Sequence, residues 1–304
     1  MKTSSLSSSD GIRGGYQGNN FALEVTFTTF LGIALYNSIE LIILIFSTFK
    51  SYHGLYFWSL LLADVAGVIP QSIGFLLKYY SLGPVWFSLT FSDIGWYFMV
   101  TGQSVVLYSR LNLVVQNHKV LRSVLAMIVI DAICFHVPTT VLTYGSNFST
   151  NAVYIDAYVI MERIQLTGFC VQEFIISGLY ILETVKLLRV DSATGDHPKR
   201  NKIMYQLVGI NLLIITIDIV LLVVEYLNFF IIQTTLKPMV YSIKLKLEFA
   251  VLGRLVVLVR SHHRPALQGP GQQDISDFVN VSRITADYTH AVPSAGHVSQ
   301  HPWE

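Results

Sequence analysis

Charged side chains lie within stretches of this sequence that are otherwise almost entirely apolar. Seven of them could form a ligand site or an ion path: Glu40, Asp64, Glu173, Asp218, Lys244, Lys246 and Glu248. At the centre of a membrane helix a charged residue costs about 2.5–3.5 kcal/mol on insertion scales, so such residues generally face other helices and pair. Hydrogen bonds between membrane helices contribute only about 0.6 kcal/mol on average. Because the insertion cost exceeds this gain, a functional role is favoured for the seven residues as a set. For any single residue, a contact that holds two helices together is the simpler explanation.

The spacing in the last apolar stretch predicts how its charges pair. Lys244 and Glu248 are four residues apart, so they lie on one helix face and can neutralise each other. Lys246 lies about 200° around the helix from Lys244, because each residue advances by about 100°. It therefore needs another partner, which we expect to be an acid in the first, second or sixth apolar stretch.

Catalytic and cofactor chemistries fit the sequence less well. A lysine in a seventh helix could carry retinal with Asp93 as counter-ion, but two lysines that each lie near an acid fit an ion-pair network better. A metal hydrolase needs about three ligands at one depth, and His136 is the only histidine within an apolar stretch. No serine or cysteine has a base at a spacing that indicates a nucleophile. We expect no enzyme activity, no metal and no cofactor.

A group of basic residues marks one side of the membrane. The third apolar stretch ends in Tyr108-Ser109-Arg110-Leu111, which places an arginine where rhodopsin-like receptors carry theirs. Receptors of that class normally have an acid directly before it, and Ser109 takes that place here. We expect Arg110 to face a cytoplasmic partner together with three residues of a later basic segment, Lys199, Arg200 and Lys202.

Seven apolar stretches carry these residues. They cover Thr26–Phe49, Leu55–Leu77, Phe87–Val114, Ser123–Tyr144, Val159–Leu182, Ile203–Tyr226 and Thr235–Val259. A helix needs about 20 residues to cross about 30 Å of hydrocarbon, and only helices or closed barrels can satisfy their backbone in lipid. The alternating pattern of a barrel strand is absent. The sequence therefore predicts an all-α membrane protein, a bundle of seven transmembrane helices with kinks at Pro70 and Pro138.

Composition agrees with a membrane protein, since 52% of the residues are hydrophobic, 13% are charged and the mean hydropathy is +0.53. The net charge of +1 argues against a nucleic-acid partner. We divide the chain into a short extracellular N-terminus (1–25), a transmembrane domain (26–259) and a cytoplasmic tail (260–304). Because the tail is rich in Pro, Gly, Ser and His, we expect it to be disordered. Cys134 and Cys170 fall within apolar stretches, where we expect buried, unpaired thiols.

The distribution of lysine and arginine predicts the orientation. With the N-terminus outside, twelve of these residues fall on the cytoplasmic side and five on the outer side, as the positive-inside rule requires. Asn147-Phe148-Ser149 is a glycosylation sequon that this topology places outside. A second sequon at Asn280 lies in the tail and would not be used.

By its sequence texture the chain resembles a fungal family of multi-pass integral membrane proteins of unassigned function, distantly similar to seven-helix receptors. The residues that carry the resemblance are Leu55–Leu61, Gly95–Tyr97, Thr101–Leu111, His136–Thr140, Thr167–Glu173 and Val240–Glu248. It covers about residues 25 to 260 and implies seven spans and a membrane location. The lysine pair and a polar fifth helix belong to the family pattern, but the resemblance brings no ligand, substrate or catalytic residue.

Two functions remain open at this stage. The first is a receptor-like signalling protein in the lipid bilayer, which would bind a small molecule among Glu40, Asp64, Asp218 and Lys246 and couple to a cytoplasmic partner through its basic loops. The second is a transporter or proton-coupled carrier that uses the same acids and lysines as its path. The plasma membrane is the default location, with an internal membrane left open.

Overall fold

The computed structural model describes residues 21–49, 54–115, 117–149, 151–193, 198–227 and 230–262. These residues form seven helical columns and no β-strand. The columns are α1 (Phe21–Thr48); α2 (Leu55–Leu62), η1 (Ala63–Val68) and α3 (Ile69–Tyr79), which are continuous; α4 (Val85–Val114); α5 (His118–Phe148); α6 (Ala152–Ala193); α7 (Pro198–Tyr226); and α8 (Phe230–His262). The first part of the predicted N-terminus and the predicted tail beyond residue 262, with Asn280, lie outside the described residues.

Five of the columns are long and apolar enough to cross a membrane. They are Phe21–Thr48, Leu55–Tyr79, His118–Phe148, Val153–Lys186 and Tyr205–Tyr226. On α5 the outward-facing side chains are large and apolar, including Ile130, Ile133, Val137 and Val141, a surface that suits lipid and not water. The chain is therefore a helical, multi-pass membrane protein.

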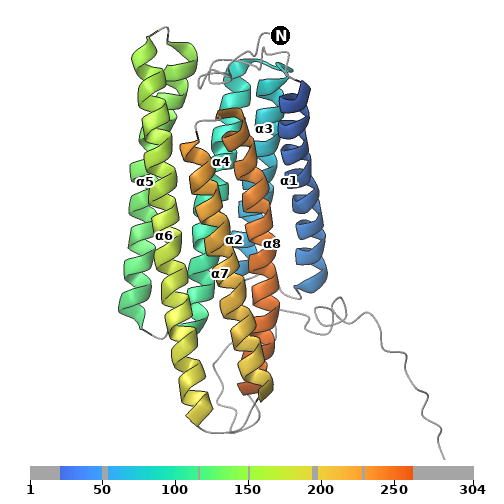
Figure 1. Ribbon diagram of the computed structural model, residues 1–304, viewed down its shortest axis with the longest axis vertical. Helices are drawn as coiled ribbons and strands as arrows, with labels where there is room; N and C mark the ends of the chain where they lie inside the picture. Colours follow the sequence, from blue (N-terminus) through green and yellow to red (C-terminus); the bar gives the residue numbers. More distant parts are fainter. Residues whose placement is uncertain are drawn as a thin grey trace, which may run out of the picture.

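The columns run alternately up and down (Figure 1), so that α1, α4, α6 and α8 begin at the upper end of the bundle as it is drawn there. The helix α6 has 42 residues, a length of about 63 Å, and extends with α7 and α8 below the other helices (Figure 1). The prediction of Val159–Leu182 for this helix was too short. Apolar composition marks where a helix lies in hydrocarbon, whereas backbone hydrogen bonding continues beyond that boundary.

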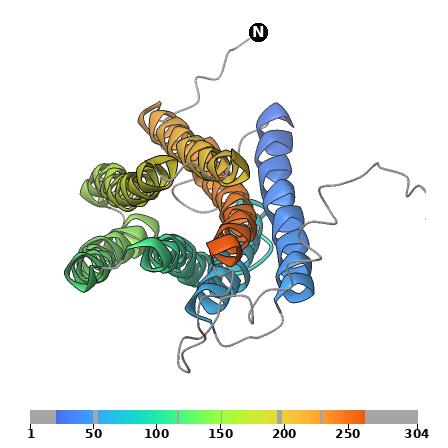
Figure 2. The same cartoon turned by 90° about the horizontal axis from the view of Figure 1, so that it is seen from below.

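Two columns lie inside the bundle (Figure 2). The helix α8 packs against α1, α7, α4 and the α2–η1–α3 column, and α4 packs against that column and against α5, α6 and α8. Neighbouring helices cover α8 and much of α4, where Ile94 and Phe98 remain exposed, so these two helices can carry polar residues on their covered faces. Neither α4 nor α8 is among the five columns that are long and apolar enough to cross a membrane by composition alone.

Glycines bring the α2–η1–α3 column unusually close to α4. A Cβ atom added at Gly95 would lie 2.4 Å from the backbone nitrogen of Gln71, and one at Gly67 would lie 2.7 Å from Met99. Gly74 and Gly102 make similar approaches to Ser92 and Ala63. Such close backbone contact is typical of small residues between membrane helices. This close contact holds the polar residues of α3 and α4 next to each other at the upper end of the bundle.

The α2–η1–α3 column contains a π-helical turn, η1, just before Pro70. Proline lacks the backbone N–H that an α-helix would use, so a kink was expected at this position. In the structure, η1 directly precedes Pro70, and the N–H of Ile69 bonds to the carbonyl of Asp64, five residues earlier. One wide turn therefore takes up the missing hydrogen bond. Pro138 lies inside α5 and Pro238, which the sequence analysis did not consider, lies inside α8.

Candidate functional site

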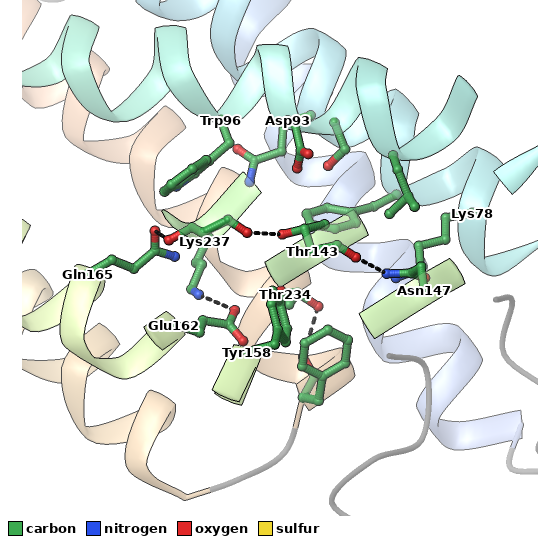
Figure 3. Close-up of a pocket in the computed structure, with 16 residues that line it drawn as sticks. Lys78, Asp93, Trp96, Thr143, Asn147, Tyr158, Glu162, Gln165, Thr234 and Lys237 are labelled. Atoms are coloured by element: carbon green, nitrogen blue, oxygen red, sulfur yellow. Dashed lines mark hydrogen bonds and ion pairs between the residues drawn. The ribbon is translucent and has the colours of Figure 1, made fainter. Parts of the chain in front are cut away.

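A polar cavity of about 60 Å³ lies between the helices near the upper end of the bundle. Residues of α3, α4, α5, α6 and α8 line it, and Figure 3 shows their side chains converging from these helices. The polar ones are Gln71, Lys78, Ser92, Asp93, Thr139, Thr143, Asn147, Tyr158, Glu162, Gln165, Thr234 and Lys237. The volume suits a few water molecules or a small polar ligand.

The charged residues of the cavity were missed by the sequence analysis. Lys78 and Lys237 are two of the five basic residues that the charge count placed on the outer side, yet only 6% of each is exposed. Lys237 binds the carboxylates of Glu162 on α6 at 2.7 Å and Glu225 on α7 at 3.1 Å. Asp93, considered only as a retinal counter-ion, lines the cavity with Lys78. A count of charges on each side of the membrane cannot show that a buried acid on a neighbouring helix holds a lysine inside the bundle.

A second layer of charge lies deeper in the bundle. The ammonium group of Lys244 on α8 contacts the carboxylate of Glu173 on α6. The same nitrogen lies 2.6 Å from a carboxylate oxygen of Asp218 on α7. All three side chains are at most 2% exposed. The ring of Tyr241 covers the ammonium group at 4.3 Å from its centroid. One lysine is therefore held between two acids without solvent.

A third layer lies toward the lower end. The guanidinium of Arg110 on α4 binds Glu248 of α8 at 2.6 Å and the side-chain oxygen of Asn211 on α7 at 2.6 Å. It also stacks on the ring of Tyr180 of α6 at 4.6 Å. Arg110 and Glu248 are fully buried. A desolvated, hydrogen-bonded pair of this kind joins four helices.

The three layers form one ion-pair ladder, which we define as Lys237, Lys244 and Arg110 with their acidic partners. Its residues repeat at helical spacing. On α8, Lys237, Lys244 and Glu248 are separated by seven and four residues, and on α7, Asn211, Asp218 and Glu225 are separated by seven each. Both spacings keep side chains on one helix face. The layers of Lys237 and Lys244 are thus about 10 Å apart along the helix.

The expected pairing of Lys244 with Glu248 was wrong. Lys244 instead pairs with acids on two other helices, and Glu248 pairs with Arg110. Residues four apart on a helix do lie on one face, but both side chains point into the bundle and reach different neighbours. In the interior, a facing helix offers a charged group with better geometry than the same helix does.

Lys246 pairs with the first helix, as one of the sequence alternatives expected. Its ammonium group lies 2.5 Å from Glu40 and 2.9 Å from the side-chain oxygen of Asn37, both on α1. The two charged side chains are 25% and 43% exposed. This pair lies on the α1 side of α8 and is separate from the ladder.

Asp64 is buried in the second column. It lies in η1 and is 0% exposed. Asp64 does not line the cavity. The structure therefore does not gather Glu40, Asp64, Asp218 and Lys246 into the single ligand site that the sequence analysis considered.

Among the residues expected to contact a partner or carry a glycan, Arg110 needs correction. Arg110 cannot contact a partner in this conformation, because its side chain is buried in the third layer. Lys199, Arg200 and Lys202 lie in the first turns of α7, at the lower end, where side chains are outside the described part of the structure. Asn147 lies in the last turn of α5, lines the cavity, and its amide donates to the carbonyl of Thr143 (Figure 3); its glycosylation stays a prediction.

The two cysteines differ in their surroundings. Both are free; Cys170 is buried on α6, whereas Cys134 is exposed on the outer face of α5. The expectation that both are buried was therefore wrong for Cys134. An apolar helix turns one face toward lipid, and the sequence does not tell which face that is.

Comparison with known proteins identifies a protein family for this chain. Residues 20–271 match the model of DUF7703, described as a domain of unknown function. The chain belongs to the DUF7703 family. No curated protein and no solved structure matches it. The matched region contains the whole cavity and the whole ladder, so both features lie within the DUF7703 domain.

Proposed function

We propose that this DUF7703 protein is a receptor and not an enzyme, with seven spans, the N-terminus outside and the C-terminus in the cytoplasm. It would sense a small polar molecule in the cavity at the upper end, which this orientation places outside. One observation carries the proposal: Lys237 and Glu162 line the cavity and also form the first layer of the ladder. A ligand in the cavity therefore meets the charges that hold α6 and α8 together.

The ladder supplies a physical route from the ligand to the other side. A ligand that bonds to Lys237 or Glu162 competes with their mutual ion pair and so favours one arrangement of α6, α7 and α8 over another. The same three helices meet again at Lys244 and at Glu248. Buried ion pairs tolerate few arrangements, so a shift in the first layer favours a change in the next.

The lower end is suited to a cytoplasmic partner. The helices α6, α7 and α8 extend beyond the others there (Figure 1), and the start of α7 carries Lys199, Arg200 and Lys202. Such a basic segment can bind an acidic protein surface, and it also attracts anionic lipid at about 1 kcal/mol per charge. The cytoplasmic leaflet of the plasma membrane carries anionic lipid, and we propose that membrane as the location of the protein.

Proximity labelling from the C-terminal tail in living cells tests the coupling. We compare the wild type with a variant in which Lys199, Arg200 and Lys202 are replaced by glutamine. The expected result is a set of signalling proteins labelled by the wild type and lost in the variant. A matched variant with Lys119→Gln and Arg122→Gln, in the first turns of α5 at the same end of the bundle, controls for a general loss of positive charge. Labelling of bulk membrane proteins alone, unchanged by either variant, would contradict the receptor proposal.

A carrier is the second candidate, because buried charges continue in three layers from the cavity toward the lower end. A carrier moves solute or protons in liposomes that contain only the purified protein, whereas a receptor does not. Glu162→Gln and Glu173→Gln should abolish such flux, and Lys246→Met should leave it intact because Lys246 lies off the ladder. Absence of flux in the wild type leaves the receptor as the better proposal.

A further inference from the structure

We propose that the middle layer of the ladder binds one proton, which Glu173 and Asp218 share around Lys244. The charge of the layer carries the inference. Lys244 brings one positive charge, while Glu173 and Asp218 bring two negative charges when both are ionised. All three side chains are at most 2% exposed, and an uncompensated charge is strongly disfavoured at such a position. One added proton makes the layer neutral.

The neighbouring charges do not remove this excess. The nearest cation on α4, Arg110, is already bound to Glu248 of α8 at 2.6 Å, so that pair is neutral by itself. Lys237, in the layer above, is bound to two acids of its own. The remaining ionisable groups around the layer are Cys170 on α6 and Tyr241 on α8, neither of which is positively charged in either protonation state.

Geometry favours a proton over a metal cation. The ammonium group of Lys244 occupies the position between the two carboxylates, because both contact the same nitrogen atom. Two oxygens bound to one nitrogen lie within about 6 Å of each other, so a proton on either acid is close to the other. A metal ion would have to share that space with the ammonium group and would be repelled by it.

The structure also offers a place for a water molecule between the first two layers. A small cavity of about 10 Å³ is lined by Gln165, Lys237, Tyr241 and apolar residues of α4 and α6. This is close to the volume that one water molecule requires. A water molecule at this position would lie beside Lys237 of the first layer and beside Tyr241, whose ring covers the ammonium group of Lys244.

Infrared spectroscopy of the purified full chain in lipid nanodiscs tests the proposal, since neutral carboxylic acids have a carbonyl band that shifts in D₂O. We expect Glu173→Gln and Asp218→Asn each to lose the band of one acid, because the single carboxylate that remains becomes the ion-pair partner of Lys244. Lys244→Gln should instead gain one band, because both acids must then be neutral.

Several outcomes would overturn the shared proton. One is an unchanged band in both Glu173→Gln and Asp218→Asn, which would mean that both acids are ionised in the wild type. Another is loss of the band in only one of these two variants. The acid replaced in that variant would then hold the proton by itself, and the two acids would not share it. If the amide variants fail to fold, Lys244→Gln decides alone, and the absence of the added band contradicts the proposal.

Discussion

At the scale of single residues, the interior of this protein depends on how each charge is paired. Arg110 shows this most clearly, because it is fully buried and bound to Glu248, Asn211 and the ring of Tyr180. Removing one partner of such a pair leaves an uncompensated buried charge, whereas replacing both partners with apolar residues often costs little. Comparing the stability of the single variant with that of the double variant therefore shows whether the fold needs the ion pair itself.

The Arg110–Glu248 pair gives the first prediction. Glu248→Leu should lower the free energy of unfolding by about 3–5 kcal/mol, because it leaves the guanidinium without its counter-ion. The double variant with Arg110→Met should recover most of that loss. Thermal unfolding of the purified variants, analysed as a double-mutant cycle, measures the coupling. A double variant that is no more stable than Glu248→Leu would show that the arginine is held by its other contacts.

At the scale of elements, the contact between the α2–η1–α3 column and α4 positions the cavity. Gly95 allows the two backbones to meet, since a Cβ atom there would lie 2.4 Å from a backbone nitrogen of α3. The side chains of Gln71, Lys78 and Asp93 enter the cavity from these two elements. The packing of two helices thus determines the width of the site.

The second prediction concerns this contact. Gly95→Ala should destabilise the protein by about 1–3 kcal/mol, because the added methyl group meets backbone atoms that cannot move without separating the helices. Gly32→Ala is the matched control, since no atom lies within 4 Å of the added Cβ at that position of α1, and alanine favours a helix by about 1 kcal/mol over glycine. The melting temperatures of the two variants measure the effect. Equal stability of both variants would contradict the close contact.

At the scale of the whole molecule, the five apolar columns surround α4 and α8, which carry many of the polar side chains (Figure 2). A helix with lipid on one side needs an apolar face, whereas a helix inside a bundle does not. This arrangement allows α4 and α8 to carry polar side chains and still serve as spans, as we propose. Seven spans would place the two ends of the chain on opposite sides of the membrane.

The third prediction tests that topology. An epitope tag at the N-terminus should bind antibody on intact cells, and a tag at the C-terminus should bind it only after permeabilisation. An odd number of spans requires this difference, and the positive-inside rule sets its direction. A soluble cytoplasmic protein with the same tag controls for leaky cells. Equal accessibility of both tags would indicate an even number of spans.

The sequence by itself determined that the chain is a helical membrane protein and where its columns lie, because apolar length and helical periodicity are local properties. It also indicated that the charges at Glu173, Asp218, Lys244 and Glu248 matter. Only the tertiary structure decided their partners. Whether Lys244 meets Glu248 or two acids on α6 and α7 depends on the depth and rotation of each helix, and these follow from packing contacts between residues far apart in the chain. The cavity residues Lys78, Glu162 and Lys237 were not predicted for the same reason.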